Sequence, residues 1–155
     1  MPVEPGSTDS AATESTSDAG VGIVVVSHSR ALARAAVDLA SQMAGDSTPT
    51  IKVAAGLDET TLGTDATAVG EAITELAGCR GILVLVDLGS AILSAEMALE
   101  FLDPDLAAKV RITGAPLVEG LVVAVVMAST GADIDAVEKE ALGALGPKQD
   151  QLTSR

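Results

Sequence analysis

The chain has 155 residues with a formal net charge of −13, and 48% of them are hydrophobic although there is one Phe and no Tyr or Trp. This length predicts one domain, and its core must be built from aliphatic side chains and alanine. The negative charge repels phosphate backbones and there are no aromatic platforms for bases, which argues against nucleic-acid binding.

Cys79 is the single cysteine, so an intramolecular disulfide and a cysteine-based zinc site are excluded. The N-terminal segment lacks the charged and apolar regions of a secretory signal. The longest apolar stretch, residues 117–128, is too short to cross a bilayer. We therefore expect a cytoplasmic protein that does not bind membranes.

Residues 1–19 are polar and contain acidic but no basic residues, which predicts a disordered tail. We expect a folded domain over residues 20–146 and a second, shorter tail over residues 147–155. Within the domain, short apolar segments predict strands at 22–26, 51–55, 81–87 and 110–113.

Apolar residues at helical spacing predict helices over about 30–43, from 64 or 65 to 77, after Ser90, and over 133–145. Residues 116–129 are rich in valine, but the spacing of their apolar residues favours a helix. In the first of these helices the residues that keep helical spacing are Leu32, Ala36, Leu39, Ala40 and Met43. After Ser90 we expect Ile92, Leu93, Met97, Leu99 and Leu102 to be available for burial. Alternating strands and helices predict an open, mainly parallel sheet with helices on both faces.

His28, the only histidine, follows directly after the first predicted strand and its Val-rich run. The carboxyl ends of parallel strands form the edge where open α/β folds bind ligands, and imidazole titrates near neutral pH. Asp87 ends the third strand at the same edge. We expect Asp87 to hold the His28 Nδ1–H and leave Nε2 free as a nucleophile. A role for Asp87 as a helix cap is about equally well supported by the sequence.

The same edge contains groups that suit an anion. Glycine-rich turns and helix N-termini present N–H groups to phosphate. These groups come from Ser29, Gly56, Gly63, Thr64, Gly89 and Ser90. Their simpler interpretation is that Ser90 and Thr64 cap helices and the glycines serve turns. The sequence has neither a nucleophile elbow nor a P-loop, and we expect no metal and no cofactor.

Two segments of the sequence are similar to motifs of a known family. They are Val24-Val25-Val26-Ser27-His28-Ser29 and Leu83-Val84-Leu85-Val86-Asp87-Leu88-Gly89-Ser90-Ala91. Over about residues 21–145 the chain resembles the phosphoryl-donor (DhaM) subunits of phosphoenolpyruvate-dependent dihydroxyacetone kinase, which belong to the EIIA family of mannose-type phosphotransferase systems. The resemblance implies that His28 accepts a phosphoryl group from the phosphocarrier HPr. It then passes this group to ADP held by the DhaL subunit, which phosphorylates dihydroxyacetone bound to DhaK.

The resemblance further implies a homodimer, with the segment after Pro116 as a candidate interface. It also implies that Asp87 orients His28 and that Gly56, Thr64, Gly89 and Ser90 line a phosphate pocket. Two alternatives stay open: an EIIA domain of a mannose-type sugar transport system, and an α/β binding module without catalysis. The Asp-Leu-Gly-Ser-Ala turn favours the kinase subunit, because mannose-type EIIA domains usually have Gly-Gly-Ser-Pro there.

Overall fold

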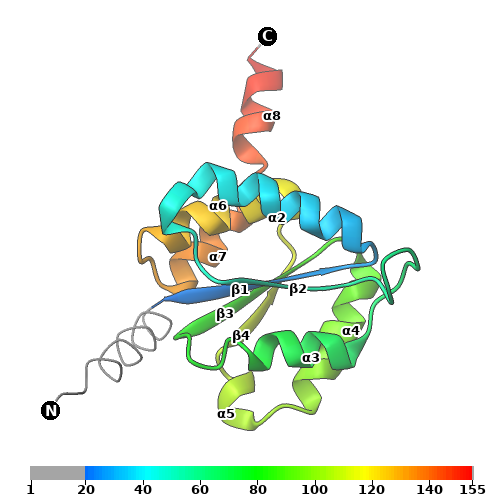
Figure 1. The fold of residues 1–155 in the computed structure, drawn as a ribbon. Coiled ribbons are helices and arrows are strands. Elements are labelled where there is room, and N and C mark those ends of the chain that lie inside the picture. The colour runs from blue at the N-terminus through cyan, green and yellow to red at the C-terminus, as the bar shows by residue number, and fades with distance from the viewer. Residues whose placement is uncertain (1–19, 155) are drawn as a thin grey trace, which may run out of the picture.

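Four parallel strands form one sheet in the order β2-β1-β3-β4, in a computed structural model that describes residues 20–154 (Figure 1). The predicted open parallel sheet is thereby confirmed. The strands are β1 (Val21–Ser27), β2 (Ile51–Ala55), β3 (Gly81–Val86) and β4 (Val110–Thr113). All four lie within one or two residues of their predicted bounds, because runs of β-branched residues between turns are a strong strand signal.

Helices cover both faces of the sheet (Figure 1). One face is covered by α2 (Arg30–Ala44), α6 (Leu117–Ser129) and α7 (Ile134–Leu142). The other is covered by α3 (Ala66–Thr74), α4 (Gly89–Glu100) and the short α5 (Pro104–Ala107). A 3₁₀ turn, η1 (Gly45–Ser47), follows α2. None of the helices within residues 20–154 is long and apolar enough to cross a bilayer.

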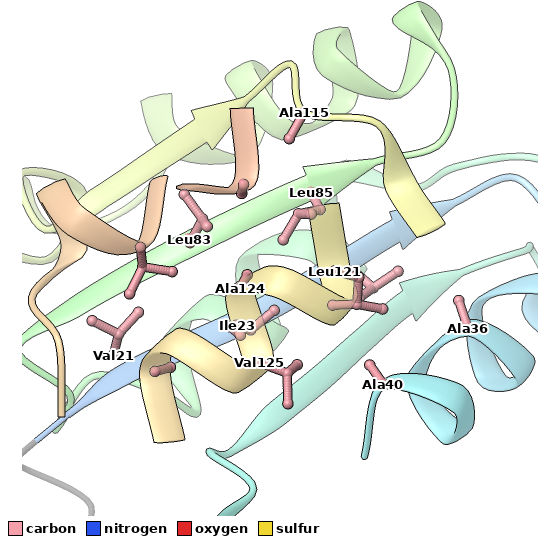
Figure 2. Close-up of a cluster of buried hydrophobic side chains, with 14 of the residues drawn as sticks. Val21, Ile23, Ala36, Ala40, Leu83, Leu85, Ala115, Leu121, Ala124 and Val125 are labelled. Atoms are coloured by element: carbon pink, nitrogen blue, oxygen red, sulfur yellow. The ribbon is translucent and has the colours of Figure 1, made fainter. Parts of the chain in front are cut away.

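The two faces of the sheet are filled by alternate residues of the same strands. On β1, Ile23 and Val25 point toward α2 and α6, whereas Val24 and Val26 point toward α3 and α4. Figure 2 shows the first of these clusters, in which Ile23 and Leu83 of the sheet face Ala124 and Val125 of α6. Since both faces are buried, β1 and β3 are continuous apolar runs rather than alternating ones.

Alanines pack α2 and α4 against the sheet. The buried residues of α2 are Ala33, Ala36 and Ala40, and those of α4 are Ala91, Ala95 and Ala98. Of the residues with helical spacing in α2, Ala36 and Ala40 are buried, whereas Leu32, Leu39 and Met43 are exposed. Of those expected to be available for burial after Ser90, Ile92, Leu99 and Leu102 pack partly buried against the core, whereas Leu93 and Met97 are exposed. Small side chains let a helix approach the sheet closely, and the larger neighbours are displaced to the flanks of the stripe.

The valine-rich segment is the helix α6, as predicted. Three other expectations have a different outcome. Helix α3 is capped by Asp65 instead of Thr64, since the Asp65 carboxylate accepts a hydrogen bond from Thr67 N–H. The expected C-terminal tail contains a helix, α8 (Gly146–Thr153), which has no buried residue and extends from the body of the fold (Figure 1). The predicted tail over residues 1–19 lies outside the described residues.

Candidate functional site

His28 and Asp87 meet where two central strands end. Val26 of β1 is paired with Val86 of β3, so the residues that follow these strands emerge side by side. The chain leaves β1 for β2 on one side and later returns to place β3 on the other. Open α/β sheets have their ligand crevice at such a reversal of strand order, outside the carboxyl ends of the strands.

The Asp87 carboxylate is saturated with hydrogen-bond donors. Its Oδ1 lies 3.0 Å from His28 Nδ1 and accepts the Leu88 N–H at 2.7 Å. Its Oδ2 accepts the His28 backbone N–H and the Ser27 hydroxyl, both at 2.9 Å. The Asp87 side chain is 8% exposed and that of His28 is 25% exposed. One acid therefore fixes both the ring and the main chain of the histidine.

The pKa of Asp87 is lowered from its ordinary value. Burial alone would raise the pKa, but the hydrogen bonds from the His28 backbone and ring, Ser27 and Leu88 stabilise the carboxylate and outweigh burial. Asp87 therefore carries its negative charge at neutral pH. A carboxylate at Nδ1 favours the tautomer with the proton on that nitrogen, which leaves a lone pair on Nε2.

Ser90 faces the other ring nitrogen. Its Oγ lies 2.8 Å from His28 Nε2, so with the proton on Nδ1 the serine hydroxyl donates to Nε2. Ser90 is exposed and stands in the first turn of α4, where the side chain makes no helix cap. The backbone N–H groups of a helix's first turn have no acceptors within the helix. Nε2 therefore lies beside a hydroxyl in the first turn of α4, on a side chain that is partly exposed.

The glycines at positions 56 and 63 serve the backbone of β1. Gly56 N–H donates to Ser27 O at 3.0 Å, and Gly63 N–H donates to His28 O at 2.9 Å. Gly56 has a φ of +66°, and a Cβ there would lie 3.2 Å from Arg30 N. These two glycines thus anchor both ends of the loop over residues 57–62, and their N–H groups are already committed instead of being directed at an anion.

The remaining predicted site residues are Gly89, Ser29 and Thr64. Gly89 begins α4 next to Ser90, and nothing lies within 4 Å of where its Cβ would be. Ser29 caps α2, with its Oγ accepting the Leu32 N–H at 3.1 Å. Thr64 pairs with Ser94 of α4, Oγ1 to Oγ, at 2.6 Å. Only Asp87 and Ser90 therefore contact the His28 side chain directly.

Comparison with known proteins places this arrangement in a family. The profile of the EIIA-man family, described as "PTS system fructose IIA component", matches residues 22–138. The chain belongs to the EIIA-man family. The fold is thereby that of a phosphotransferase-system IIA domain.

The curated relatives of this EIIA-man chain include phosphoryl donor subunits. It is 49% identical over 134 residues to "PEP-dependent dihydroxyacetone kinase, phosphoryl donor subunit DhaM" of Escherichia coli K12, covering 85% of this chain and 28% of that protein. It is 37% identical over 120 residues to the corresponding "kinase 2" subunit of Listeria innocua, covering 77% and 95%. The chain thus spans about a quarter of the first relative and nearly all of the second.

Solved structures share the fold. A crystal structure titled as the unknown function protein EF1359 superposes with a TM-score of 0.70 at 28% identity, covering 80% of this chain and 94% of that one. A PTS IIA protein associated with the fucose utilization operon of Streptococcus pneumoniae gives a TM-score of 0.56 at 22% identity, covering 86% and 96%. The second likeness concerns the fold alone.

Two residues of this EIIA-man site were not singled out from the sequence. Ser27 is fully buried at the end of β1, and its hydroxyl bonds both Asp87 and the Ser29 carbonyl. A serine inside an otherwise apolar strand was the available signal. Ser94 lies one helical turn after Ser90, a spacing that places the two side chains on one face of α4. Within residues 20–154, His, Cys, Asp and Glu side chains form no group of three suited to a metal.

Arg30 uses two of its guanidinium nitrogens for contacts within the fold. Its Nε donates to Ala55 O at 2.9 Å, and its Nη1 lies 3.2 Å from Glu59 Oε2. Arg34 contacts the same glutamate at 2.8 Å. These hydrogen bonds with Arg34 and Arg30 lower the pKa of Glu59. The two arginines therefore tie α2 to the loop over residues 57–62.

Proposed function

We propose that this chain is the phosphohistidine carrier of a phosphoenolpyruvate-dependent dihydroxyacetone kinase. His28 takes a phosphoryl group from HPr and passes it to ADP bound on a DhaL subunit, which phosphorylates dihydroxyacetone held by DhaK. The names of the DhaM relatives support this assignment. The main structural support is that both ring nitrogens of His28 have a partner at the carboxyl edge of the sheet. Nδ1 contacts the Asp87 carboxylate, and Nε2 faces the Ser90 hydroxyl.

The chemistry follows from the tautomer that Asp87 favours. The Nε2 lone pair forms a bond to phosphorus while the bond between phosphorus and the donor breaks, and its electron pair leaves with the donor. The ring keeps the Nδ1 proton and becomes positively charged. The Asp87 carboxylate, 3.0 Å away, offsets this charge. Transfer to ADP runs the same step in the other direction, with a phosphate oxygen of ADP as the attacking atom.

The groups around Nε2 suit a phosphoryl group in transit. Phosphoryl transfer depends mainly on positioning and on electrostatic stabilisation of the equatorial oxygens. When phosphorus occupies Nε2, the Ser90 hydroxyl loses its acceptor on the ring and donates to a phosphoryl oxygen instead. The first-turn N–H groups at Gly89 and Ser90 add donors at the N-terminus of α4. No step of this mechanism requires a metal ion.

Intact-mass spectrometry tests the proposal. After incubation with phosphoenolpyruvate, enzyme I and HPr, we expect an acid-labile gain of one phosphoryl group in the wild-type chain. His28→Ala should show no gain. If the wild type stays unmodified while HPr is phosphorylated, the proposal is wrong and a binding module without catalysis becomes the better account.

The choice of acceptor needs a second experiment. A sugar-transport EIIA domain would use the same histidine, and the family description names a fructose IIA component. The phosphorylated chain should transfer its phosphoryl group to ADP bound on DhaL. In a pull-down, the chain should also retain DhaL. Transfer to a membrane-associated sugar complex, with none to DhaL–ADP, would assign the chain to sugar transport instead.

The proposal includes a homodimer acting in the cytoplasm.

A further inference from the structure

Three hydrogen bonds join His28, the segment after β2 and helix α4 into a closed ring. Gly63 N–H donates to His28 O at 2.9 Å. The next residue, Thr64, pairs with Ser94 at 2.6 Å between hydroxyl oxygens. One turn earlier on α4, Ser90 Oγ lies 2.8 Å from His28 Nε2. The ring begins on the main chain of the histidine and ends on its reactive nitrogen.

The Thr64–Ser94 contact is the link in this ring that joins the two polypeptide segments through side chains alone. The residues are 30 positions apart, and both are half-buried. The capping of α3 does not need Thr64, because Asp65 performs it. The hydrogen bonds to the ring nitrogens of His28 come from Asp87 and Ser90, not from Ser94. The effect of Ser94 on the histidine therefore passes through Thr64 on one side and through the first turn of α4 on the other.

We propose that Ser94 is a positioning residue for phosphoryl transfer, acting through its hydrogen bond to Thr64. This contact holds the Gly63–Thr64 segment and the start of α4 at a fixed separation, and so sets where Ser90 stands relative to Nε2. Displacements of about 1 Å in such a supporting contact slow catalysis strongly, with rate losses of up to about 100-fold. The inference rests on the proposed function, because it concerns the rate of the same phosphoryl transfer.

Ser94→Ala tests this role. We expect its rate of His28 phosphorylation at saturating phospho-HPr to fall about tenfold, with KM for phospho-HPr within about twofold of wild type. Ser94→Thr keeps the hydroxyl and should restore most of the rate. Ser129→Ala is the matched control, since the Ser129 hydroxyl bonds only the carbonyl of Val126 on its own helix. The control should phosphorylate at the wild-type rate.

A double-mutant cycle tests whether the effect passes through Thr64. Thr64→Val removes the partner hydroxyl while keeping the shape of the side chain, and Thr74→Val on α3 is its control. In the Thr64→Val background, Ser94→Ala should cause no further loss of rate, because the contact is already absent. An unchanged rate in Ser94→Ala, or an equal loss in both backgrounds, would overturn the inference.

A spectroscopic readout separates positioning from simple stability. In the unphosphorylated protein, ¹⁵N NMR of His28 should show a shift of Nε2 in Ser94→Ala and Thr64→Val, since Ser90 moves relative to the ring. A lower melting temperature without any change in Nε2 or in rate would leave Ser94 with a structural role only and overturn the inference. Failure of the wild type to be phosphorylated is a different result, and it would remove the proposed function itself.

Discussion

Asp87 holds His28 at two points, because one carboxylate oxygen meets ring Nδ1 at 3.0 Å while the other accepts the backbone N–H of the same residue at 2.9 Å. The main-chain contact fixes where the ring begins and the ring contact fixes how it is turned. Orientation and tautomer of the nucleophile thus depend on a single side chain at the end of the neighbouring strand.

Asp87→Asn should keep the fold but slow phosphorylation of His28 by up to about 10⁴-fold, the loss seen when a tautomer-fixing Asp is replaced by its amide. Both carboxylate oxygens accept backbone N–H groups, from His28 and Leu88. An amide has one oxygen, so its NH₂ group must face a donor on one side. Quench-flow phosphorylation and ¹⁵N NMR of the ring measure the effect. Asp46→Asn, at an exposed position in η1, is the control, and equal rates in the two variants would remove Asp87 from the site.

The stability of the protein should fall in acid partly through Asp87. Its folded-state pKa lies below the ordinary 3.8, so the unfolded chain binds the proton more tightly. The stabilisation is fully present above the unfolded-state value and is lost as pH drops through the folded-state value. Urea unfolding at pH 7 and near pH 3 should show a smaller loss in Asp87→Asn than in wild type. Asp58, Glu59 and Glu119 also have lowered pKa values, and the comparison keeps their contribution constant.

Ser90→Ala should slow phosphorylation by about 10- to 100-fold, somewhat less than the loss of a buried oxyanion donor, because Ser90 is exposed. The hydroxyl is removed from Nε2, and with it one donor to the phosphoryl group. Phosphohistidine should also hydrolyse faster in the variant. Both rates follow from mass spectrometry over time, with Ser154→Ala, just after α8, as the control. A rate above that of wild type would mean that Ser90 mainly blocks Nε2.

The architecture and the edge that holds the site were predictable from the sequence. Buried parallel strands are continuous β-branched runs, and their carboxyl ends necessarily share one edge. That geometry alone brings His28 and Asp87 together from positions 59 residues apart. The contact of each ring nitrogen depends on side-chain placement, which strand order does not specify.

The sequence did not predict the hydrogen bonds between segments that are distant along the chain. Thr64 and Asp65 are adjacent and both are good capping residues, so only the structure shows that Asp65 caps α3 and frees Thr64 for Ser94. The expected burial of Leu93 and Met97 on α4 was wrong, because alanine counts little in hydropathy although it permits the closest packing. The commitment of Gly56 and Gly63 N–H groups to β1 has no local sequence signal.

The proposed homodimer predicts a particular response to mutation. On the face covered by α2 and α6, large apolar side chains are exposed; these are Leu32, Leu39, Met43, Val118 and Val126. Gel filtration at micromolar concentration should show a dimer, and Leu39→Glu should convert it to a monomer by placing a charge in the contact. Leu152→Glu, at a more exposed position on α8, should leave the dimer intact. A monomeric wild type would contradict the assembly, and a dimeric Leu39→Glu would place the interface elsewhere.

Gly56→Ala should destabilise the protein more than Gly131→Ala. Both glycines have positive φ, +66° and +87°, so alanine at either position costs about 1–2 kcal/mol of backbone strain. At Gly131 nothing lies within 4 Å of an added Cβ. At Gly56 the Cβ would meet Asp58 O at 3.0 Å and Arg30 N at 3.2 Å, and both are backbone atoms that cannot rotate away.

The displaced backbone at Gly56 should also affect the site. The 57–62 loop is anchored at Ser27 O and His28 O, so its movement disturbs the carbonyl of the reactive histidine. We therefore expect Gly56→Ala to phosphorylate more slowly than wild type and Gly131→Ala to match it. Urea unfolding and quench-flow phosphorylation measure the two effects. If the variants lose equal stability, the contacts at Gly56 are relieved without strain, and the loop is less firmly tied to β1 than its hydrogen bonds indicate.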